Sequence, residues 1–443
     1  MRSHKKRPNY GFKKTMSDLF FNLGLILAGL VLIALIIMLK AKTAIEFSVE
    51  PIVFLYTTFV TTFQLSRVVG AMFHKKSMEK VMKGFESTTW DEYEPTVTFV
   101  IPCKNEETVI RRTIENCYAV DYPRSKIEVI AINDGSTDGT LEEMQEAKRE
   151  HKDLVIVDWE VNRGKRQGMA EGIRRAKGEI VVQLDSDSFI NPKTFRGLVR
   201  PFKNPRVGAV SAHTRPQNSD ENLLTKMQTA YYFVSFRILK AAESTFMKVF
   251  CCSGCCSAYR RSVVLPVLNK WVKEKFLGLP VTWGDDRALT NCILRKDYIT
   301  IYSEEVEAFT IVPNSLKQFL KQQVRWKKGW FVNSVFATRF ILRKDPFVTL
   351  TYFFPLILIT LITPFMAIRA LLYNPLIRGI SPIYYILGVF LMSAVMTTYY
   401  RHIERKNKYW PYVFVWSAIN MVILSFVLFY ALFTIQNRKW GTR

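Results

Sequence analysis

Two phosphate-binding motifs are absent from this sequence of 443 residues. It contains neither the G-x-x-x-x-G-K-[ST] loop of P-loop enzymes nor the G-x-G-x-x-G fingerprint of dinucleotide-binding domains. Each of these motifs supplies backbone N–H groups that hold phosphates at the start of a helix. Their absence excludes P-loop ATPases and Rossmann-type dehydrogenases.

Cysteine is scarce, and its spacing does not match a zinc finger. The chain has 7 cysteines, an odd number, and a cytosolic domain keeps such thiols reduced. Four of them lie between Cys251 and Cys256, but no second Cys or His pair follows at finger-like spacing, and Cys292 stands alone. We expect these cysteines to act as small apolar side chains near a site rather than as metal ligands.

Acidic residues are also few, since 38 Asp and Glu face 62 Lys and Arg and leave a formal charge of +24. The basic residues gather beside apolar segments, at positions 2–14, 74–76, 401–408 and 438–443. The positive-inside rule places such clusters in the cytoplasm. Nucleic-acid binding is not expected, because the clusters flank apolar segments and form no stripe on the polar part of the chain.

Five long apolar segments flank a polar block of roughly residues 85–330. The first has 21 residues and no charge, long enough to cross a hydrocarbon core of about 30 Å and longer than the apolar region of a signal peptide. The five segments are Leu19–Leu39, Pro51–Phe73, Phe347–Tyr373, Ile383–Tyr400 and Pro411–Ile435.

The last apolar segment raises a problem of topology. If all five segments crossed the membrane, the basic residues at 401–408 and at the C-terminal end would lie on opposite sides. We therefore predict that Pro411–Ile435 is interfacial or re-entrant, which leaves four spans. Leu316–Leu342 mixes Lys and Arg with Trp and Phe at helical spacing, which predicts an amphipathic helix in the membrane interface, and Tyr231–Phe250 is a second candidate.

The polar block alternates apolar runs with helical patterns. Continuous apolar runs begin near Thr96, Lys126, Leu154 and Glu179, and helical patterns with short loops separate them. The third of these helices is expected over Met169–Ala176. Such runs are typical of a mostly parallel sheet with helices on both faces, an α/β fold. Ligands bind such sheets at the carboxyl ends of the strands.

Polar side chains follow the ends of these four runs. Any one of them could be a turn or a helix cap, but four in register favour a site. Two of them, Asp185 and Asp187, repel each other unless a cation lies between them, which predicts Mg²⁺ or Mn²⁺ bridging to substrate phosphates. The strand-end residues are Glu106, Asp134, Lys165, Arg166, Asp185 and Asp187.

Further motifs make the sequence recognisable. After NDGSTDGT (133–140) and DSD (185–187) come CCSGCCSAYRRS (251–262), WGDDRALTN (283–291), QQVRW (322–326) and WGTR (440–443). This ordered set resembles the processive family 2 glycosyltransferases of membranes over nearly the whole chain, and it implies a GT-A type domain. The likeness is greatest to hyaluronan synthases, with chitin-oligosaccharide synthases of the nodulation type next. Gly254-Cys255 departs from the usual Gly-Pro of hyaluronan synthases and resembles the chitin type as much.

The resemblance and the strand ends together assign roles to individual residues. Asp286 is expected to be the general base, and Asp187 is expected to bind the metal. The expected donor-nucleotide residues are Glu106, Asp134, Lys165, Arg166, Asp185, Arg325, Trp440 and Arg443. The expected acceptor residues are Cys251, Gly254, Asp285, Gln322 and Trp326.

These assignments imply a processive inverting synthase that makes hyaluronan from UDP-GlcNAc and UDP-GlcA and exports it through its own channel. The alternative is a chitin or poly-N-acetylglucosamine synthase that uses UDP-GlcNAc alone. A transporter with a regulatory domain would not need a metal, a base and a diphosphate clamp together. A nonprocessive lipid-sugar transferase would not need Q-x-x-R-W.

The expected organisation has four parts. Residues 1–84 hold a cytosolic tail and two spans, 85–315 the cytosolic catalytic domain, 316–346 the interfacial helix, and 347–443 two spans, the re-entrant segment and the tail. The expected protein is a multi-pass protein of the cell membrane whose partners are UDP-sugars, the growing polysaccharide and the bilayer. Neither nucleic acid nor an obligate protein partner is expected.

Overall fold

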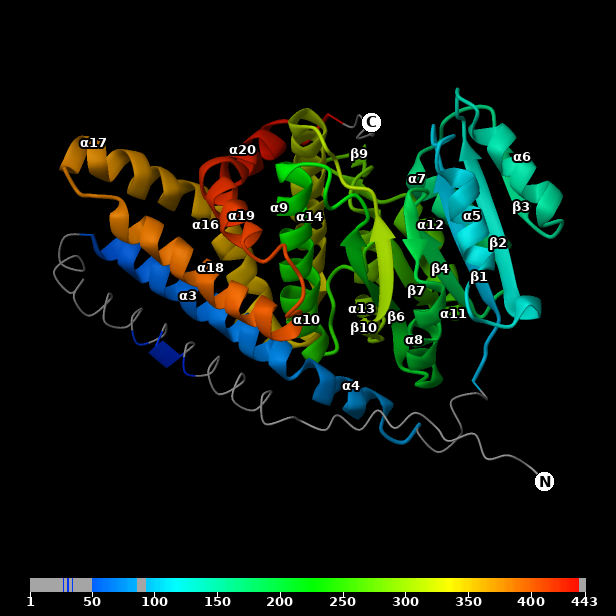
Figure 1. Ribbon diagram of the computed structural model, residues 1–443, viewed down its shortest axis with the longest axis horizontal. Helices are drawn as coiled ribbons and strands as arrows, with labels where there is room; N and C mark the ends of the chain where they lie inside the picture. Colours follow the sequence, from blue (N-terminus) through cyan, green and yellow to red (C-terminus); the bar gives the residue numbers. More distant parts are fainter. Residues whose placement is uncertain (1–26, 28–29, 32–33, 35–49, 86–92, 438–443) are drawn as a thin grey trace.

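The computed structural model describes residues 50–85 and 93–437, together with four positions between 27 and 34. Figure 1 shows an α/β domain at one end of the molecule and a bundle of long helices at the other. The predicted span Leu19–Leu39 lies almost entirely outside the described residues, and so do Trp440 and Arg443. Predictions about these segments stay predictions.

An eight-stranded sheet forms the centre of the α/β domain, in the order β3-β2-β1-β4-β7-β6-β10-β5. The pairs β1–β2, β1–β4, β2–β3 and β6–β10 are parallel, and the other three are antiparallel. The predicted α/β fold is confirmed, with a mixed sheet. The strands are β1 (Val97–Cys103), β2 (Ile127–Asp134), β3 (Val155–Trp159), β4 (Ile180–Leu184), β5 (Ser188–Ile190), β6 (Val207–Pro216), β7 (Cys256–Arg260) and β10 (Ile299–Thr310), and a separate hairpin pairs β8 (Lys275–Phe276) with β9 (Leu279–Pro280).

Both faces of the sheet are buried, as the continuous apolar runs predict. Along β2, Val129 and Ala131 pack into one apolar cluster, and Ile130 and Ile132 pack into another. Alternate side chains of a strand point to opposite faces, so each cluster covers one face. The helices of the domain are α5 (Ile110–Tyr118), α6 (Thr140–Glu150), α7 (Lys165–Arg175), α8 (Arg196–Val199), α9 (Leu223–Phe233), α10 (Ala241–Thr245), α11 (Arg261–Val264), α12 (Leu268–Val272) and α13 (Asp285–Arg295).

The helix bundle contains three helices that are long and apolar enough to cross a membrane, among the residues that the structure describes. They are Pro51–Met72, Pro346–Arg378 and Tyr412–Phe433. The elements of the bundle are α3 (Pro51–Met72), α4 (His74–Met82), α14 (Leu316–Lys344), α15 (Pro346–Val348), α16 (Phe354–Ile368), α17 (Asn374–Arg378), α18 (Ile383–Ile403), α19 (Tyr412–Ile419) and α20 (Ser425–Phe433), with π-helical turns η7 (Thr349–Phe353), η8 (Arg369–Tyr373) and η9 (Asn420–Leu424) between them.

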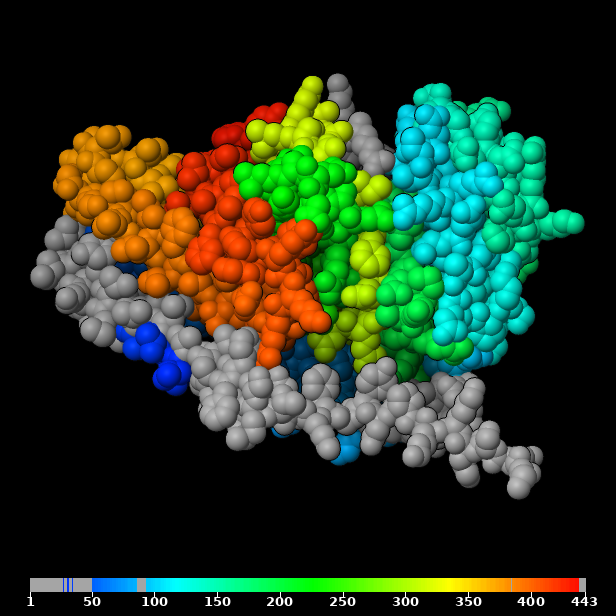
Figure 2. Space-filling model, viewed as in Figure 1, coloured from blue at the N-terminus to red at the C-terminus, as the bar shows by residue number. Residues whose placement is uncertain are grey.

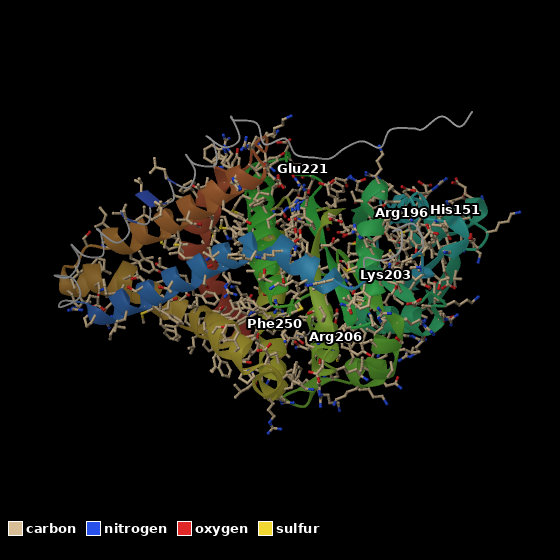
Figure 3. The ribbon with its side chains drawn as sticks, turned by 90° about the horizontal axis from the view of Figure 1, so that it is seen from below. His151, Arg196, Lys203, Arg206, Glu221 and Phe250 are labelled. Atoms are coloured by element: carbon tan, nitrogen blue, oxygen red, sulfur yellow. The ribbon has the colours of Figure 1, made fainter. Side chains whose placement is uncertain are left out.

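The second candidate interfacial segment, Tyr231–Phe250, is largely buried between the sheet and the bundle. The ring of Phe233 stacks on Tyr400 at 3.6 Å between centroids. A Cβ added to Gly70 of α3 would lie 3.2 Å from Cβ of Ala242, so α3 packs closely on α10. In Figure 3, Phe250 lies where the bundle meets the sheet domain. The segment joins the two halves of the molecule.

The segment α19–α20 contacts the sheet domain at one end and α14 at the other. Before it, Lys408 forms an ion pair with Asp220 at 2.8 Å. After it, Lys328 of α14 donates hydrogen bonds to the carbonyl oxygens of Thr434 and Asn437, at 2.6 and 3.1 Å. In Figure 2 these C-terminal helices pack directly against residues of the sheet domain.

Candidate active site

One cavity of about 1090 Å³ brings most of the predicted site residues together. It begins beside the C-terminal end of β4 and the N-terminal end of α13. It then passes α14 and continues among α3, α16, α18 and α19. The predicted residues that line it are Lys165, Asp185, Asp187, Cys251, Gly254, Asp285, Asp286, Gln322, Arg325 and Trp326.

The D-x-D turn follows directly from β4, which ends at Leu184. Asp185 forms an ion pair with Lys165, and Asp187 lines the cavity one residue before β5. Burial lowers the pKa of Lys165, but the charge of Asp185, the hydrogen bond to it and the charge of Asp285 together outweigh burial and raise the pKa. Lys165 therefore stays protonated at neutral pH and places a positive charge where a diphosphate would need one.

Helix α7 begins earlier than the sequence indicates. We expected a helix from Met169, but it begins at Lys165. Gly164 occupies the N-cap with φ of +94°, a conformation that glycine adopts readily. Lys165 and Arg166 therefore lie in the first turn of a helix, which fixes their directions.

The G-D-D turn is held against the Q-x-x-R-W helix by two glycines. Gly284 has φ of +65°, and a Cβ added there would lie 2.7 Å from Nδ2 of Asn333 and 3.0 Å from Cα of Gly329. Asn333 donates a hydrogen bond to the carbonyl oxygen of Gly284 at 3.2 Å. The motifs 283–291 and 322–326 are therefore brought side by side by backbone packing.

Asp286 lies beside the predicted acceptor residues. Its Oδ2 is 3.4 Å from Sγ of Cys251 and accepts a hydrogen bond from the backbone N–H of Gly254 at 3.3 Å. Burial raises the pKa of the Cys251 thiol to about 11, so the thiol stays protonated and acts as a donor to Asp286. A Cβ on Gly254 would lie 3.1 Å from Oδ1 of Asp185. The backbone of Gly254 thus lies between Asp286, the predicted base, and Asp185 of the D-x-D turn.

The Q-x-x-R-W motif presents polar atoms and an aromatic ring to the cavity. Oε1 of Gln322 and Nε of Arg325 are buried and have no hydrogen-bond partner in the described part of the chain. Such atoms are destabilising unless a ligand satisfies them. The Trp326 ring lies 6.4 Å from the Tyr231 ring, which stacks on Trp416 at 3.9 Å. These rings form an aromatic surface suited to the apolar face of a sugar.

Two predicted donor residues, Glu106 and Asp134, do not line the cavity. Asp134 ends β2, and its carboxylate accepts hydrogen bonds from the backbone N–H groups of Arg163 and Gly164 at 2.6 and 2.9 Å. Burial raises the pKa of Asp134, against the opposite effect of these two donors. In this arrangement Asp134 holds the loop that precedes α7.

Arg166 is also outside the cavity lining. Its Nε donates to Oδ1 of Asp285 at 2.9 Å, and its Nη1 donates to the carbonyl oxygen of Trp271 at 3.0 Å. Glu274 lies 3.3 Å from the same Nη1. The nucleotide contacts predicted for Glu106, Asp134 and Arg166 stay predictions.

The cavity also has lining residues that the sequence motifs did not indicate. Two of them, Gln64 and Arg67, belong to α3 and so lie within a candidate span. The others include Lys240, Glu243 and Arg287. The signal for the first two was visible, because they are the polar exceptions in the second apolar segment. An ionisable residue inside a membrane segment marks a functional site by default.

Comparisons with known proteins agree with the motifs. The family model described as Glycosyl transferase family 2 matches residues 98–267. The hyaluronan synthase of Streptococcus pyogenes serotype M3 is 32% identical over 369 residues, covering 81% of this chain and 86% of that protein. An N-acetylglucosaminyltransferase of Azorhizobium caulinodans is 29% identical over 352 residues, covering 79% and 87%.

Among solved structures, the mannosyltransferase PcManGT of Pyrobaculum calidifontis has a similar fold, with a TM-score of 0.54 and 20% identity over 87% of this chain and all of that chain. The similarity to the curated relatives extends through both the sheet domain and the bundle. The protein is therefore a glycosyltransferase of family 2, and it belongs to the same family as the hyaluronan synthases.

Proposed function

We propose that this protein is a processive, inverting synthase that builds a β-linked, GlcNAc-containing polysaccharide, hyaluronan from UDP-GlcNAc and UDP-GlcA, and exports it through its own bundle. The observation that carries this proposal is the cavity of about 1090 Å³, lined by D-x-D, G-D-D and Q-x-x-R-W residues at one end and by candidate membrane helices at the other. A nonprocessive transferase would not need such a continuation.

The donor's diphosphate fits beside Lys165 and Arg325. Lys165 is bound to Asp185, and Arg325 lies near enough for its positive charge to lower the pKa of Lys165. Two cations beside a leaving diphosphate stabilise the negative charge that develops as the sugar is transferred. Glu106, Asp134, Arg166, Trp440 and Arg443 complete the proposed nucleotide site.

A divalent cation, Mg²⁺ or Mn²⁺, fits at Asp187. Among the described residues no three His, Cys, Asp or Glu side chains are grouped to hold a metal, so phosphate oxygens and water would supply the other ligands, as is usual for Mg²⁺. The solved mannosyltransferase was crystallised with GDP-Man and Mn²⁺. When bound, the ion would neutralise charge on the leaving diphosphate.

Asp286 acts as the general base in this proposal. It takes the proton from the acceptor hydroxyl as that oxygen attacks C1 of the donor sugar, and a positioned base contributes about 10²–10⁴-fold to the rate. The thiol of Cys251 and the N–H of Gly254 hold the carboxylate in place. A single in-line displacement inverts an α-linked donor into a β-linked product.

The acceptor end of the growing chain would lie on Trp326, within reach of Gln322 and Asp285. Beyond it, hydroxyl and amide groups on the bundle helices line the cavity, among them Thr57, Thr61, Thr363, Ser393 and Asn420. Such groups can form hydrogen bonds with a hydroxylated polymer inside the membrane.

The proposed arrangement in the cell membrane is multi-pass with a cytosolic catalytic domain. The contacts of Lys408 with Asp220, and of Lys328 with Thr434, support the prediction that 411–435 enters and leaves the membrane on the cytosolic side. The segment's length alone would allow a span.

A chitin or poly-N-acetylglucosamine synthase is the second candidate, favoured by the likeness to the Azorhizobium enzyme and by Gly254-Cys255. Membranes containing the protein should be supplied with UDP-GlcNAc alone, UDP-GlcA alone and both. Hyaluronan synthesis predicts polymer only with both donors, degraded by hyaluronan lyase. Polymer from UDP-GlcNAc alone, resistant to the lyase and sensitive to chitinase, would establish the second candidate.

A further inference from the structure

Arg67 is a buried arginine in the wall of the cavity, inside the candidate span α3. Its side chain is almost entirely enclosed, with 3% of the residue exposed. The guanidinium carbon lies 4.1 Å from the ring centroid of Tyr352 and 4.8 Å from that of Phe63. Nη2 donates to Oγ of Ser66 at 3.3 Å, while Nε and Nη1 have no partner in the described part of the chain.

An arrangement of this kind is unfavourable unless something compensates for it. A buried charge is strongly destabilising without a paired charge, and contact with aromatic rings offsets only part of that penalty. Hydrogen bonds from guanidinium N–H groups to a carboxylate are charge-assisted, and a carboxylate would satisfy both the charge and the free donors. The group that fits Arg67 best is therefore a carboxylate.

Glu243, a carboxylate that lines the same cavity, does not fill that place. It accepts hydrogen bonds from the hydroxyl of Tyr352 and from the backbone N–H of Phe250, the latter at 3.0 Å. No ion pair joins it to Arg67 among the described residues. Glu243 thus fixes Tyr352 under the guanidinium and leaves two of the guanidinium's N–H groups for a ligand.

Other charged side chains line the same cavity. Lys240 and Arg287 line it together with Arg67, and the carboxylates of Glu243 and Asp286 act on Arg287. Lys240 donates to the carbonyl oxygen of Cys251, and Arg287 follows Asp286 directly in the chain. Burial lowers the pKa of Arg287, but nearby acidic groups, Glu243 and Asp286 among them, raise it overall, so Arg287 lies close to both the proposed base and Glu243.

We propose that Arg67, together with Arg287 of the same cavity lining, forms a subsite for the carboxylate of an acidic sugar in the polymer as it leaves the acceptor site. The ligand class is a glycan that contains hexuronate residues. A neutral poly-N-acetylglucosamine chain offers hydroxyl and amide groups but no charge to balance the guanidinium. The inference rests on the proposed function and selects its acidic product over the neutral one.

The first test measures binding and does not depend on polymer synthesis. The ligands are a short oligosaccharide of alternating hexuronate and N-acetylhexosamine and the same oligosaccharide with its carboxyl groups reduced to alcohols. Binding to the purified full-length protein in detergent is measured for each. The wild type should bind the acidic ligand about tenfold more tightly, since charge-assisted hydrogen bonding is at stake.

Three variants sharpen this measurement. Arg67→Met keeps the length of the side chain without its charge and should bind both ligands equally. Arg67→Lys keeps the charge but lacks the fixed planar donors of the guanidinium, and it should retain part of the preference. Arg174→Met removes an exposed arginine of α7, outside the cavity, and should keep the full preference.

Equal binding of the two ligands by the wild type would overturn the proposal, and so would an undiminished preference in Arg67→Met. If Arg67→Met does not fold, the wild type and Arg67→Lys still decide the question. The polymer assay with both donors separates the two levels of inference. A polymer made without any preference for the acidic ligand would refute the subsite alone, and an absence of polymer from any UDP-sugar would refute the proposed function.

Discussion

The D-x-D turn and the G-D-D turn each carry two carboxylates, and consecutive residues of α7 bind the first carboxylate of each. Lys165 forms an ion pair with Asp185, and Arg166 forms one with Asp285. One helical turn therefore holds both acidic turns of the active site. The second carboxylate of each turn is the one to which we assign chemistry.

The two ion pairs differ in their exposure. The side chains of Lys165 and Asp185 are 18% and 25% exposed, and both line the cavity. Those of Arg166 and Asp285 are 7% and 9% exposed, and Arg166 is outside the lining. A ligand can rearrange the first pair, because it lines the cavity and is partly exposed to solvent. The second pair is a fixed support, and it positions the turn that carries the proposed base.

The largest expected loss of turnover is that of Asp286→Asn, which removes the proposed base from the G-D-D turn. The amide keeps the shape and the contacts with Cys251 and Gly254 but cannot accept the acceptor's proton, so turnover should fall by about 10²–10⁴-fold. UDP binding should change little, because the groups assigned to it lie on other residues. Steady-state kinetics and UDP titration measure the two quantities.

The matched control is Asp153→Asn, which changes an exposed carboxylate that pairs with Arg124 and should leave turnover intact. A parallel loss of UDP affinity and turnover in Asp286→Asn would make Asp286 a donor ligand rather than the base.

Asp187→Asn should remove the proposed metal ligand from the D-x-D turn. An amide is a far poorer ligand for Mg²⁺ or Mn²⁺ than a carboxylate, so activity should fall by about a hundredfold or more at low metal concentration if the ion stabilises developing charge. Excess EDTA should abolish wild-type activity, and either cation should restore it. Full wild-type turnover in EDTA would eliminate the proposed metal.

Comparing Arg166→Met with Lys165→Met would sharpen the contrast between the two ion pairs. Removing Arg166 leaves Asp285 as an uncompensated buried charge, which should lower the free energy of unfolding by about 3–5 kcal/mol. Removing Lys165 leaves a partly exposed carboxylate, so its main effect should be on donor affinity. Thermal unfolding in detergent and UDP titration distinguish the two. Equal loss of stability in both variants would contradict the division.

The sheet domain was predictable because its strands are continuous apolar runs. Of the three side chains Glu106, Asp134 and Asp185 that follow β1, β2 and β4, however, only Asp185 lines the cavity. The D-x-D, G-D-D and Q-x-x-R-W motifs were visible because each is a short local pattern. What the sequence could not give is the partner of each charge. Arg166 and Asp285 are 119 positions apart, and no local pattern joins them.

The first turn of α7 was missed for a related reason. Its N-cap is Gly164, which is a weaker signal than the Ser, Thr, Asp or Asn that usually precede a helix. The difference matters for function, because it changes Lys165 and Arg166 from loop residues into helix residues with fixed directions. That Arg67 and Glu243 line one cavity could likewise not be predicted, because it depends on packing between α3 and α10, which are far apart in the chain.

Gly172→Ala tests whether α7 must lie close to the sheet for both ion pairs to form. A Cβ on Gly172 would overlap Cγ1 of Val100 and lie 3.2 Å from Cδ1 of Ile132, so the helix must move outward. Overpacking of this kind destabilises by about 1–3 kcal/mol, and the shift should weaken donor binding because Lys165 moves with the helix.

Gly388→Ala is the control, since nothing lies within 4 Å of its added Cβ in α18 and alanine favours a helix over glycine by about 1 kcal/mol. Thermal unfolding should therefore show a loss of stability in Gly172→Ala and a gain in Gly388→Ala. UDP titration should show a reduced donor affinity only in Gly172→Ala. Unchanged UDP affinity in a destabilised Gly172→Ala would show that the sheet can release α7 without disturbing the charges that it carries.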